Sequence, residues 1–381
     1  MMGPSVRATL LSAASLAILS STVTAQTFSS CNPVNGGQCP PNPALGRSVA
    51  VDFTKGASDL FTNQGTPTYD SNGANFAVAK SGDAPQINSK FYIMFGQLEI
   101  TMKAAPGVGV VSSVVLQSDC LDEIDWEWLG GNNDQVQSNY FGKGLTTSYN
   151  RGAFHPNPGN QNSFKTYTID WTADQIVWQI DGSTVRALPV AQAVQGQYPQ
   201  TPMQVKVGSW SGGDSANAPG TIQWAGGPTN YAAGPFVMQV KSLKVTDYST
   251  GTTYAYNGQA GTWQSIVANG GSVNPKGGSG GSSPIKAAAA PAVTSASPGI
   301  PYPFPGTPRD SASDYKTPSI YPWVAAPTTL QSVKAASSTL LPFLPAGWTV
   351  SDTGRAIPPS SAPVSKPFPY PPSDITSEQT R

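Results

Sequence analysis

Four carboxylates crowd into one short apolar stretch, LDEIDWEWLG, residues 121–130, although only 11% of the chain is charged. Successive side chains of a β-strand point to opposite faces of a sheet. On a strand, one face would carry three of the carboxylates: Glu123, Asp125 and Glu127. The other face would carry the apolar side chains and point into a core: Ile124, Trp126 and Trp128. The pattern therefore predicts an acidic strand, with Asp122 at its entrance.

Crowded carboxylates repel one another, so such a row is costly unless its charge is used or compensated. Repulsion should raise the pKa of at least one member, so that one carboxyl keeps a proton near neutral pH while another is ionised. A retaining glycosidase needs these two states, because one carboxylate attacks the anomeric carbon and one acid protonates the leaving oxygen. We expect a proton shared through Asp125 to couple the three groups.

The spacing of the outer carboxylates makes a further demand on the sheet. Retaining glycosidases hold their two carboxyl groups about 5 to 5.5 Å apart, whereas residues four apart on a strand are about 13 Å apart along the backbone. A concave sheet face would bring Glu123 and Glu127 together. A Ca²⁺ site is the alternative, but a rigid strand lacks the backbone carbonyl ligands of a calcium loop. We therefore favour catalysis without a metal.

Other catalytic patterns are missing from the sequence. His155, in RGAFHPNPGN, is the only histidine, which excludes a multi-histidine zinc site. No Gly-x-Ser-x-Gly element supports a serine hydrolase. We expect His155 to lie in a turn-rich loop, where it serves the turn or touches substrate, and we expect no cofactor.

The elements around the acidic strand predict a β-rich domain over residues 26–270. Short runs of alternating or β-branched residues are separated by Gly, Pro, Asn and Asp. Examples are GQLEITMKA from 96, VVSSVVLQ from 110, FKTYTIDWT from 164, MQVKVGSW from 203 and FVMQVKSLKV from 236. Asp181 and Gly182, between QIVWQI and STVRAL, predict a type I′ hairpin turn. We expect an all-β jelly-roll sandwich of two sheets with a concave cleft.

The two ends of the chain differ in composition from this domain. Residues 1–25 carry Arg7, an apolar run and Val23-Thr24-Ala25, which is typical of a cleavable signal peptide, although a short membrane anchor is the alternative. Residues 271–381 form a Gly/Ser linker and a tail rich in Pro, Ser and Thr, which predicts disorder. The tail ends without an apolar run, so we expect no GPI anchor.

The net charge of the chain limits the classes of molecule that it can bind, and its cysteines suit an oxidising compartment. Lys and Arg total 21, as do Asp and Glu, so we expect a neutral polymer as partner and no nucleic acid. No segment after residue 25 has the length and apolarity of a membrane span, so we expect none. In an oxidising compartment Cys31 and Cys39 can close a small loop, which leaves Cys120 as a buried free thiol or, alternatively, a reactive one. We expect a secreted monomer.

The Glu-x-Asp-x-Glu spacing resembles the active-site strand of glycoside hydrolase family 16. Segments further along are similar to its fungal Crh-type cell-wall transglycosylases: LQSDCLDEIDWEWLGG, VQSNYFGKG, KVGSWSGGD and GTIQWAGGPTNY. The resemblance covers about residues 26–260. It implies a nucleophile at Glu123, an acid and base at Glu127, and an orienting carboxylate at Asp125. It also implies transfer of a cleaved chitin chain to β-glucan or chitin in the cell wall, with weak chitin hydrolysis.

Further residues are candidates for sugar binding. Aromatic rings in Gly-rich loops can stack on a pyranose, and three occur here: Trp210, Trp224 and Tyr231. Asn139, Tyr140 and Lys143 follow the acidic strand and could bind sugar hydroxyls, but packing and turn roles remain open. Trp171 and Trp178 lie in strongly alternating strands, which favours a core position.

Two other functions remain open at the level of sequence. One is a secreted endo-β-1,3(4)-glucanase, which would hydrolyse glucan instead of transferring chitin. The other is a wall-binding, lectin-like protein without activity. Three crowded carboxylates argue against a pure binder, because such a protein gains nothing from them.

Overall fold

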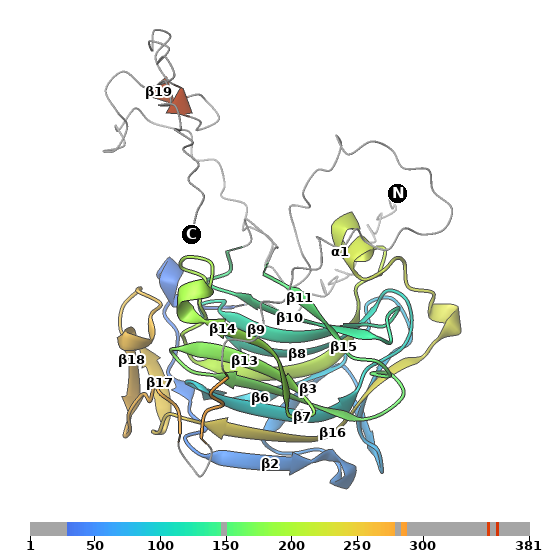
Figure 1. Cartoon of the computed structure of the whole chain (residues 1–381), viewed down its shortest axis with the longest axis horizontal. Helices are drawn as coiled ribbons and strands as arrows, with labels where there is room; N and C mark the ends of the chain where they lie inside the picture. The colour runs from blue at the N-terminus through green and yellow to red at the C-terminus, as the bar shows by residue number, and fades with distance from the viewer. Residues whose placement is uncertain (1–28, 146–150, 279–282, 288–348, 351–355, 358–381) are drawn as a thin grey trace, which may run out of the picture. The chain divides into compact units, whose positions relative to one another are not determined.

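Alternating segments of the sequence form long antiparallel strands in the computed structural model (Figure 1). The structure describes residues 29–145, 151–278, 283–287, 349–350 and 356–357. The predicted signal peptide and most of the predicted tail lie outside these residues. The five segments expected to be strands are strands: β7 (Gly96–Lys103), β8 (Val110–Ser118), β12 (Lys165–Trp171), β15 (Met203–Ser211) and β16 (Phe236–Asp247).

A seven-stranded sheet has the order β11-β10-β9-β8-β15-β6-β3. Its remaining members are β3 (Phe61–Gln64), β6 (Gln86–Ile93), β9 (Glu123–Leu129), β10 (Gln135–Phe141) and β11 (Ala153–Pro156). Every pairing along this order is antiparallel. The acidic strand β9 is therefore hydrogen-bonded on both sides, by β8 and β10.

An eight-stranded sheet contains β14-β13-β12-β7-β16-β5-β4, and β2 also pairs with β16. Its other members are β2 (Ser48–Asp52), β4 (Thr68–Asp70), β5 (Gly73–Val78), β13 (Gln175–Ile180) and β14 (Ser183–Pro189). Asp181 and Gly182 join β13 to β14 with φ angles of 48° and 77°. Positive φ at both positions confirms the predicted I′-type hairpin.

Small elements complete the fold. A three-stranded sheet contains β1 (Asn42–Pro43), β17 (Thr253–Tyr256) and β18 (Ile266–Asn269), and it lies at the left of Figure 1. The one α-helix of the described residues is α1 (Pro219–Trp224). Short 3₁₀ turns are η1 (Pro33–Asn35), η2 (Phe53–Lys55), η3 (Val190–Gln192), η4 (Tyr231–Ala233) and η5 (Trp263–Ser265). In a separate unit, β19 (Thr349–Val350) pairs with β20 (Ala356–Ile357).

The core between the two large sheets is rich in aromatic side chains. Four tryptophans are fully buried there: Trp126, Trp128, Trp171 and Trp178. The ring of Trp128 on the seven-stranded sheet meets Tyr167 on the eight-stranded sheet edge to face, with centroids 4.6 Å apart. Edge-to-face pairs of this kind add stability beyond the area that they bury. The predicted all-β sandwich, and the core positions of Trp171 and Trp178, are confirmed.

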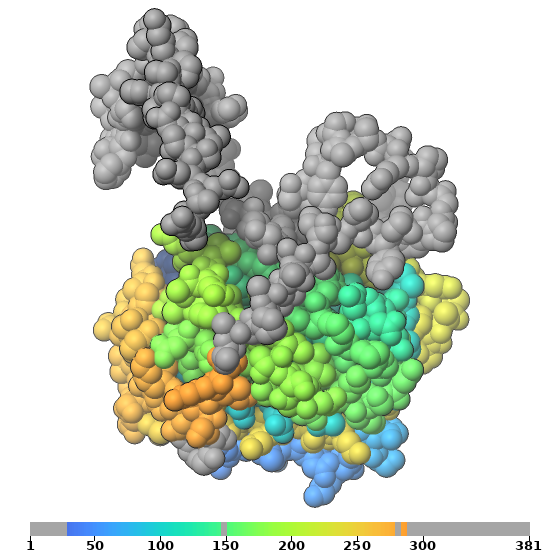
Figure 2. Space-filling view, in the orientation of Figure 1, coloured from blue at the N-terminus to red at the C-terminus, as the bar shows by residue number. Residues whose placement is uncertain are grey.

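The chain continues against this domain beyond residue 270. Pro275 accepts a backbone hydrogen bond from Ala173, just after β12, at 2.9 Å. Further on, the carbonyl of Ile285 accepts a hydrogen bond from the Gln175 side chain at 2.8 Å. Figure 2 shows orange residues of this part against the green surface of the eight-stranded sheet. None of the helices in the described residues is long and apolar enough to cross a membrane.

Candidate active site

Strand β9 has one acidic face and one apolar face, as predicted. Trp126 and Trp128 belong to the buried core cluster, and the three carboxylates alternate with them on the opposite face of the sheet. Glu123, Asp125 and Glu127 are 4%, 1% and 5% exposed. We call this outer side of β8, β9, β10 and β15 the carboxylate face.

Burial raises the pKa of both outer carboxyl groups well above the usual value. For Glu123, loss of water is the largest cause, followed by the negative charges of Asp125 and Glu127, while Lys206 opposes the rise. For Glu127, burial is again the largest cause and the charge of Asp125 adds to it, while the Ser113 hydroxyl opposes the rise by hydrogen bonding. A buried carboxyl with carboxylate neighbours keeps its proton to a higher pH.

Asp125 lies between these two groups on β9, and few hydrogen-bond donors surround its carboxylate. Burial raises its pKa to about 7, and this rise is opposed by hydrogen bonding to Glu123, by the positive charge of Arg186 and by the backbone of Asn139. Among the described residues, no donor meets either carboxylate oxygen of Asp125 in normal hydrogen-bond geometry. Two carboxyl groups can hydrogen-bond only if one carries a proton. Glu123 and Asp125 are therefore suited to share a proton.

Three carboxyls that hold fewer than three charges can divide acid and nucleophile roles. A protonated member can donate to a leaving oxygen, while an ionised member can attack a carbon. The geometry alone therefore supports displacement chemistry at a carbon that carries an oxygen leaving group, with no demand for a cofactor.

Polar side chains of the neighbouring strands line the carboxylate face. The register places Ser113 and Gln117 of β8 opposite Glu127 and Glu123. On the far side, Asn139 of β10 is opposite Asp125. The predicted position of Asn139 beside the acidic strand is thus observed. Sequence reasoning missed Ser113 and Gln117, although pairing VVSSVVLQ with the acidic strand in period two would have placed both on this face.

A lysine also reaches the carboxylate face. Lys206 of β15 donates a hydrogen bond to Gln117, and it lies near enough to Glu123 for the two charges to interact. Burial lowers the pKa of Lys206 to about 8, against the negative charges of Glu123 and Asp119. No sequence signal singled out Lys206, because its strand pairs with β8 from about 90 residues away in the chain.

The three candidate aromatic residues have different settings. The sequence predicts that Trp210 lies in a loop, but it lies within β15. Its ring stacks on Trp224 at the end of α1, with centroids 6.1 Å apart and planes 21° apart. Trp210 Nε1 donates to the Ser113 hydroxyl at 3.1 Å. Tyr231, in η4, donates its hydroxyl to Asp214 at 2.8 Å. The tryptophan pair therefore connects with the carboxylate face through Ser113.

Tyr140 and Lys143 lie away from the carboxylate face. Tyr140 is opposite Ile124, so alternation turns it into the core, where it is 2% exposed. Its hydroxyl accepts a hydrogen bond from the backbone N–H of Val194 at 3.1 Å. Lys143 pairs with the fully buried Asp122, with Nζ 2.5 Å from Oδ1. Both side chains therefore have structural partners.

His155 lies on the edge strand β11 and not in a loop. It is 2% exposed, and its ring meets Trp126 edge to face in the core, with centroids 5.9 Å apart. Burial, with the nearby charge of Arg186, lowers the pKa of His155 to about 4. Arg186 donates to the Ser138 hydroxyl at 3.0 Å, so that hydroxyl can in turn donate to His155 Nε2 at 2.7 Å. His155 is thus a neutral core residue.

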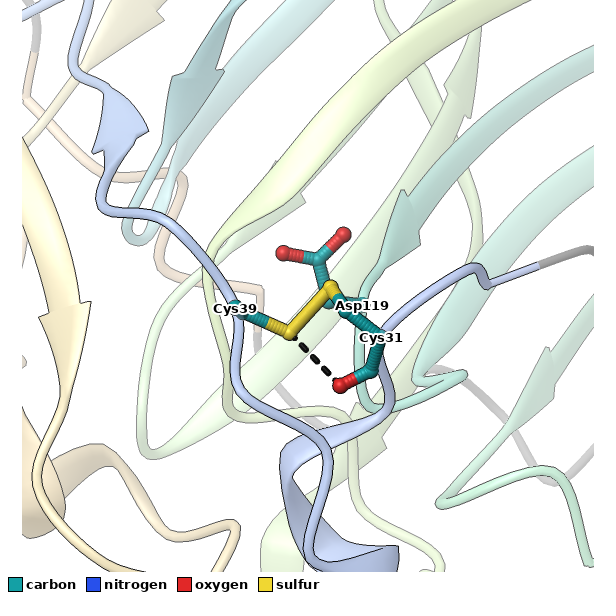
Figure 3. Close-up of side chains that lie close together, drawn as sticks. All are labelled: Cys31, Cys39 and Asp119. Carbon is teal, nitrogen blue, oxygen red and sulfur yellow. Dashed lines mark hydrogen bonds between the residues drawn. A yellow bond between two sulfur atoms is a disulfide. The ribbon is translucent and has the colours of Figure 1, made fainter.

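Cys31 and Cys39 form the expected disulfide, beside Asp119 in Figure 3. These three residues have the only metal-ligand spacing among the described residues, within 4.8 Å of one another. Disulfide sulfurs offer no thiolate, so this group is not a metal site. Cys120 is free and buried, and burial raises its pKa to about 12, which favours the inert thiol.

Comparisons with known proteins agree with this site. Residues 54–226 match the model of the glycosyl hydrolases family 16. A Crh-like protein 4 from Aspergillus fumigatus is 57% identical over 91% of this chain and 76% of its own length. Another Crh-like protein 4, from Botryotinia fuckeliana, is 53% identical over 93% and 92%.

A solved structure is also similar. A Crh5 transglycosylase in complex with NAG is 50% identical, with a TM-score of 0.61, and the match covers 63% of this chain and all of that one. Identity at this level over most of the chain, together with the acidic strand, establishes the relationship. The chain belongs to the Crh-like proteins of glycosyl hydrolases family 16, a family of retaining glycosidases and transglycosylases.

Proposed function

We propose that this protein is a secreted, retaining transglycosylase that cleaves chitin in the fungal cell wall and transfers the chain to β-glucan or chitin. The observation that carries the proposal is the row of three buried carboxyls on β9, with the pKa of both outer members raised. The relatives support it, since one similar structure is a transglycosylase that holds NAG. We propose that this protein binds polysaccharides and no other class of partner.

In the first step, Glu123 attacks the anomeric carbon while the glycosidic bond to the leaving oxygen breaks. Glu127 gives its proton to that oxygen, so the leaving sugar departs as an alcohol. Asp125 takes a share of the Glu123 proton before the attack, which leaves Glu123 as the ionised nucleophile. A covalent ester between Glu123 and the sugar results.

In the second step, a sugar hydroxyl attacks the same carbon and the ester bond to Glu123 breaks. Glu127, now ionised, removes the hydroxyl proton. Water competes for the ester, so transfer requires an acceptor held in line with the carbon, where orientation supplies a large effective concentration. Trp210 and Trp224 are the proposed stacking surface, and Asn139 is the proposed hydrogen-bonding group. Tyr231, whose hydroxyl is held by Asp214, is a further proposed sugar-binding residue.

Replacement of the outer carboxyls tests the assignment. Glu123→Gln and Glu127→Gln should each lower transfer from chitin oligosaccharide to a labelled β-glucan acceptor by at least about a hundredfold, because each step needs both groups. The measurement is mass spectrometry of the products, with circular dichroism to confirm folding. Glu99→Gln, an exposed carboxylate of β7, is the matched control.

Product analysis also separates the other functions. Near-normal transfer by either variant would refute the proposed roles. Release of short products from mixed-linkage glucan, without transfer from chitin, would identify an endo-β-1,3(4)-glucanase instead. Binding of chitin oligomers without turnover in a long incubation would identify a wall-binding protein.

A further inference from the structure

A serine hydroxyl lies between the tryptophan pair and Glu127. Ser113, on β8, is fully buried and stands directly opposite Glu127 on β9 and Gly208 on β15. Side chains directly opposite on antiparallel strands have Cβ atoms about 4.5 to 5.5 Å apart. Glycine at 208 leaves the other neighbouring position without a side chain. The Ser113 hydroxyl therefore has two neighbours on this face: the side chain of Glu127 and the ring of Trp210.

The N–H of the Trp210 ring makes the Ser113 hydroxyl oxygen an acceptor. Trp210 Nε1 can only donate, and it donates to Ser113 Oγ at 3.1 Å. The oxygen therefore serves as acceptor toward Trp210, which leaves its own hydrogen available for donation to the Glu127 side chain directly opposite. In agreement, hydrogen bonding by Ser113 opposes the rise in the pKa of Glu127.

The indole itself is held in place. Trp210 packs against Val111 and Ala225, and its ring stacks on Trp224 with centroids 6.1 Å apart. A donor on a packed ring has little freedom, so the hydroxyl that it contacts is also restrained. A catalytic side chain is held in its orientation by hydrogen bonds from residues that are themselves fixed by packing.

We propose that Trp210 Nε1–H and the Ser113 hydroxyl form a hydrogen-bond relay that positions Glu127 and favours its ionised form. This inference rests on the proposed role of Glu127 as acid and base. In the second step, the relay would support the ionised carboxylate that removes the acceptor proton. Trp210 would then have two separate functions, one through its ring face and one through its N–H.

Other groups near Glu127 fix the background of its titration. The charged neighbours on its own strand are Asp125 and Glu123, and Lys206 lies near Glu123 on β15. Arg186 of β14 acts on Asp125 from the core side. On β10, the residue directly opposite Glu127 is Gln137, which carries no charge. None of these groups changes in the variants proposed next.

Removal of either relay member should shift the pH profile upward. A hydrogen bond donated to a carboxylate stabilises the ionised form, so Ser113→Ala and Trp210→Phe should raise the pKa of Glu127. The general acid must be protonated, so the alkaline limb of kcat/KM should move to higher pH, by about one unit for a single bond to a charged group. The double variant should shift no further than Ser113→Ala alone.

The choice of substitutions separates the relay from stacking and from stability. Phe at 210 keeps a ring face but lacks the N–H, so kcat should fall more than KM rises. Ser209→Ala is the matched control, because it removes a hydroxyl on the core side of β15 that donates to Val111 at 3.0 Å. This control should leave the alkaline limb at the wild-type pH.

A second measurement does not depend on activity. Titration of ¹³C-labelled glutamate carboxyls by NMR, with Glu127→Gln to assign the signal, should show the same upward shift in both variants. An unmoved signal and an unmoved limb in Trp210→Phe would overturn the relay while leaving the proposed function intact. Failure of the wild type to transfer or hydrolyse chitin would refute the function, and the NMR titration would still decide the relay.

Discussion

At the scale of single residues, the carboxyls that suit β9 to catalysis also reduce its stability. Each of the three carboxyls on β9 has a raised pKa, which means that folding favours its protonated form. The folded protein then binds more protons than the unfolded chain at intermediate pH. Its free energy of unfolding must therefore fall as the pH rises through that window.

Asp125→Asn should make this cost visible. With a pKa of about 7 when folded and 3.8 as the reference, Asp125 loses its favourable protonation between about pH 4 and pH 7. Such a shift corresponds to about 4 kcal/mol at most, and relaxation around the site should reduce the effect to about 1 to 2 kcal/mol. The variant should therefore be more stable than wild type at pH 8, and the gain should vanish near pH 4.

Urea denaturation at the two pH values provides the measurement. Other buried carboxyls, including Asp247, titrate in the same window, so only the difference between variant and wild type is informative. Glu99→Gln serves again as the exposed control. A variant that is less stable than wild type at pH 8 and equally so at pH 4 would contradict this account.

At the scale of elements, the entrance of β9 is fixed by a buried ion pair. Asp122 Oδ1 accepts hydrogen bonds from the backbone and side chain of Lys143, just after β10, at 3.0 and 2.5 Å. Its Oδ2 accepts from the backbone of Gln200 at 2.9 Å and from the hydroxyl of Thr201 at 2.7 Å, just before β15. One carboxylate thus joins the ends of three strands of the seven-stranded sheet, β9, its neighbour β10, and β15 on the far side of β8.

Lys143→Met should therefore reduce stability and not substrate affinity. It leaves a buried Asp122 without its cation, which costs about 3 to 5 kcal/mol for buried pairs in general. The remaining donors should reduce the loss to about 2 to 3 kcal/mol. Urea denaturation should show this loss, while KM for chitin oligosaccharides, measured at a temperature where the variant is folded, should stay within about twofold.

The exposed pair Lys276–Asp174 provides a matched control. Its side chains are 75% and 61% exposed, so Lys276→Met should cost less than about 1 kcal/mol. A KM that rises tenfold in Lys143→Met, with little loss of stability, would restore Lys143 as a substrate-binding residue.

These elements also explain which parts of the site could be predicted. The period-two pattern of LDEIDWEWLG predicts both faces of β9, because alternation is local. The same rule excludes a common face for Asn139 and Tyr140, which are consecutive in β10, but the sequence does not tell which one turns outward. The contact of Trp210 with Ser113 joins residues 97 apart in the sequence, so no local signal predicted it. Lys143 and Asp122 are only 21 residues apart, but the sequence does not tell that Lys143 turns back to the entrance of β9.

At the scale of the whole molecule, composition and turns predict a two-sheet sandwich but not its strand order. β15 pairs with β8 and β6, across a long stretch of chain, and this pairing brings Lys206 and Trp210 to the carboxylate face. Such contacts follow from the packing of whole sheets. The change in composition near residue 270 likewise gives no sign that the next residues contact the domain.

Those residues predict a difference between two shortened chains. Asn274 donates its backbone N–H to the Ser249 hydroxyl at 2.9 Å, and Ile285 donates to the Asp170 carboxylate at 3.1 Å. Each hydrogen bond contributes about 0.5 to 1.5 kcal/mol net, and the loss of Ile285 removes a donor from a buried carboxylate. A chain ending at residue 270 should therefore be less stable than one ending at residue 287, by about 2 to 4 kcal/mol.

Thermal unfolding of residues 26–270 and 26–287 would measure this difference. For a domain of this size, about 1 kcal/mol shifts the melting temperature by roughly 2 to 4 °C, so the shorter chain should melt several degrees lower. Asp170→Asn should also lower the melting temperature of both chains, because the same oxygen accepts from Gln97 and Tyr248, and the drop should be larger in the longer chain, where Ile285 donates to it as well. Equal melting temperatures for the two chains would place the end of the folded domain at residue 270. A lower melting temperature for the shorter chain would extend the folded domain to residue 287. Both chains should remain active, because the carboxylate face lies on the other sheet.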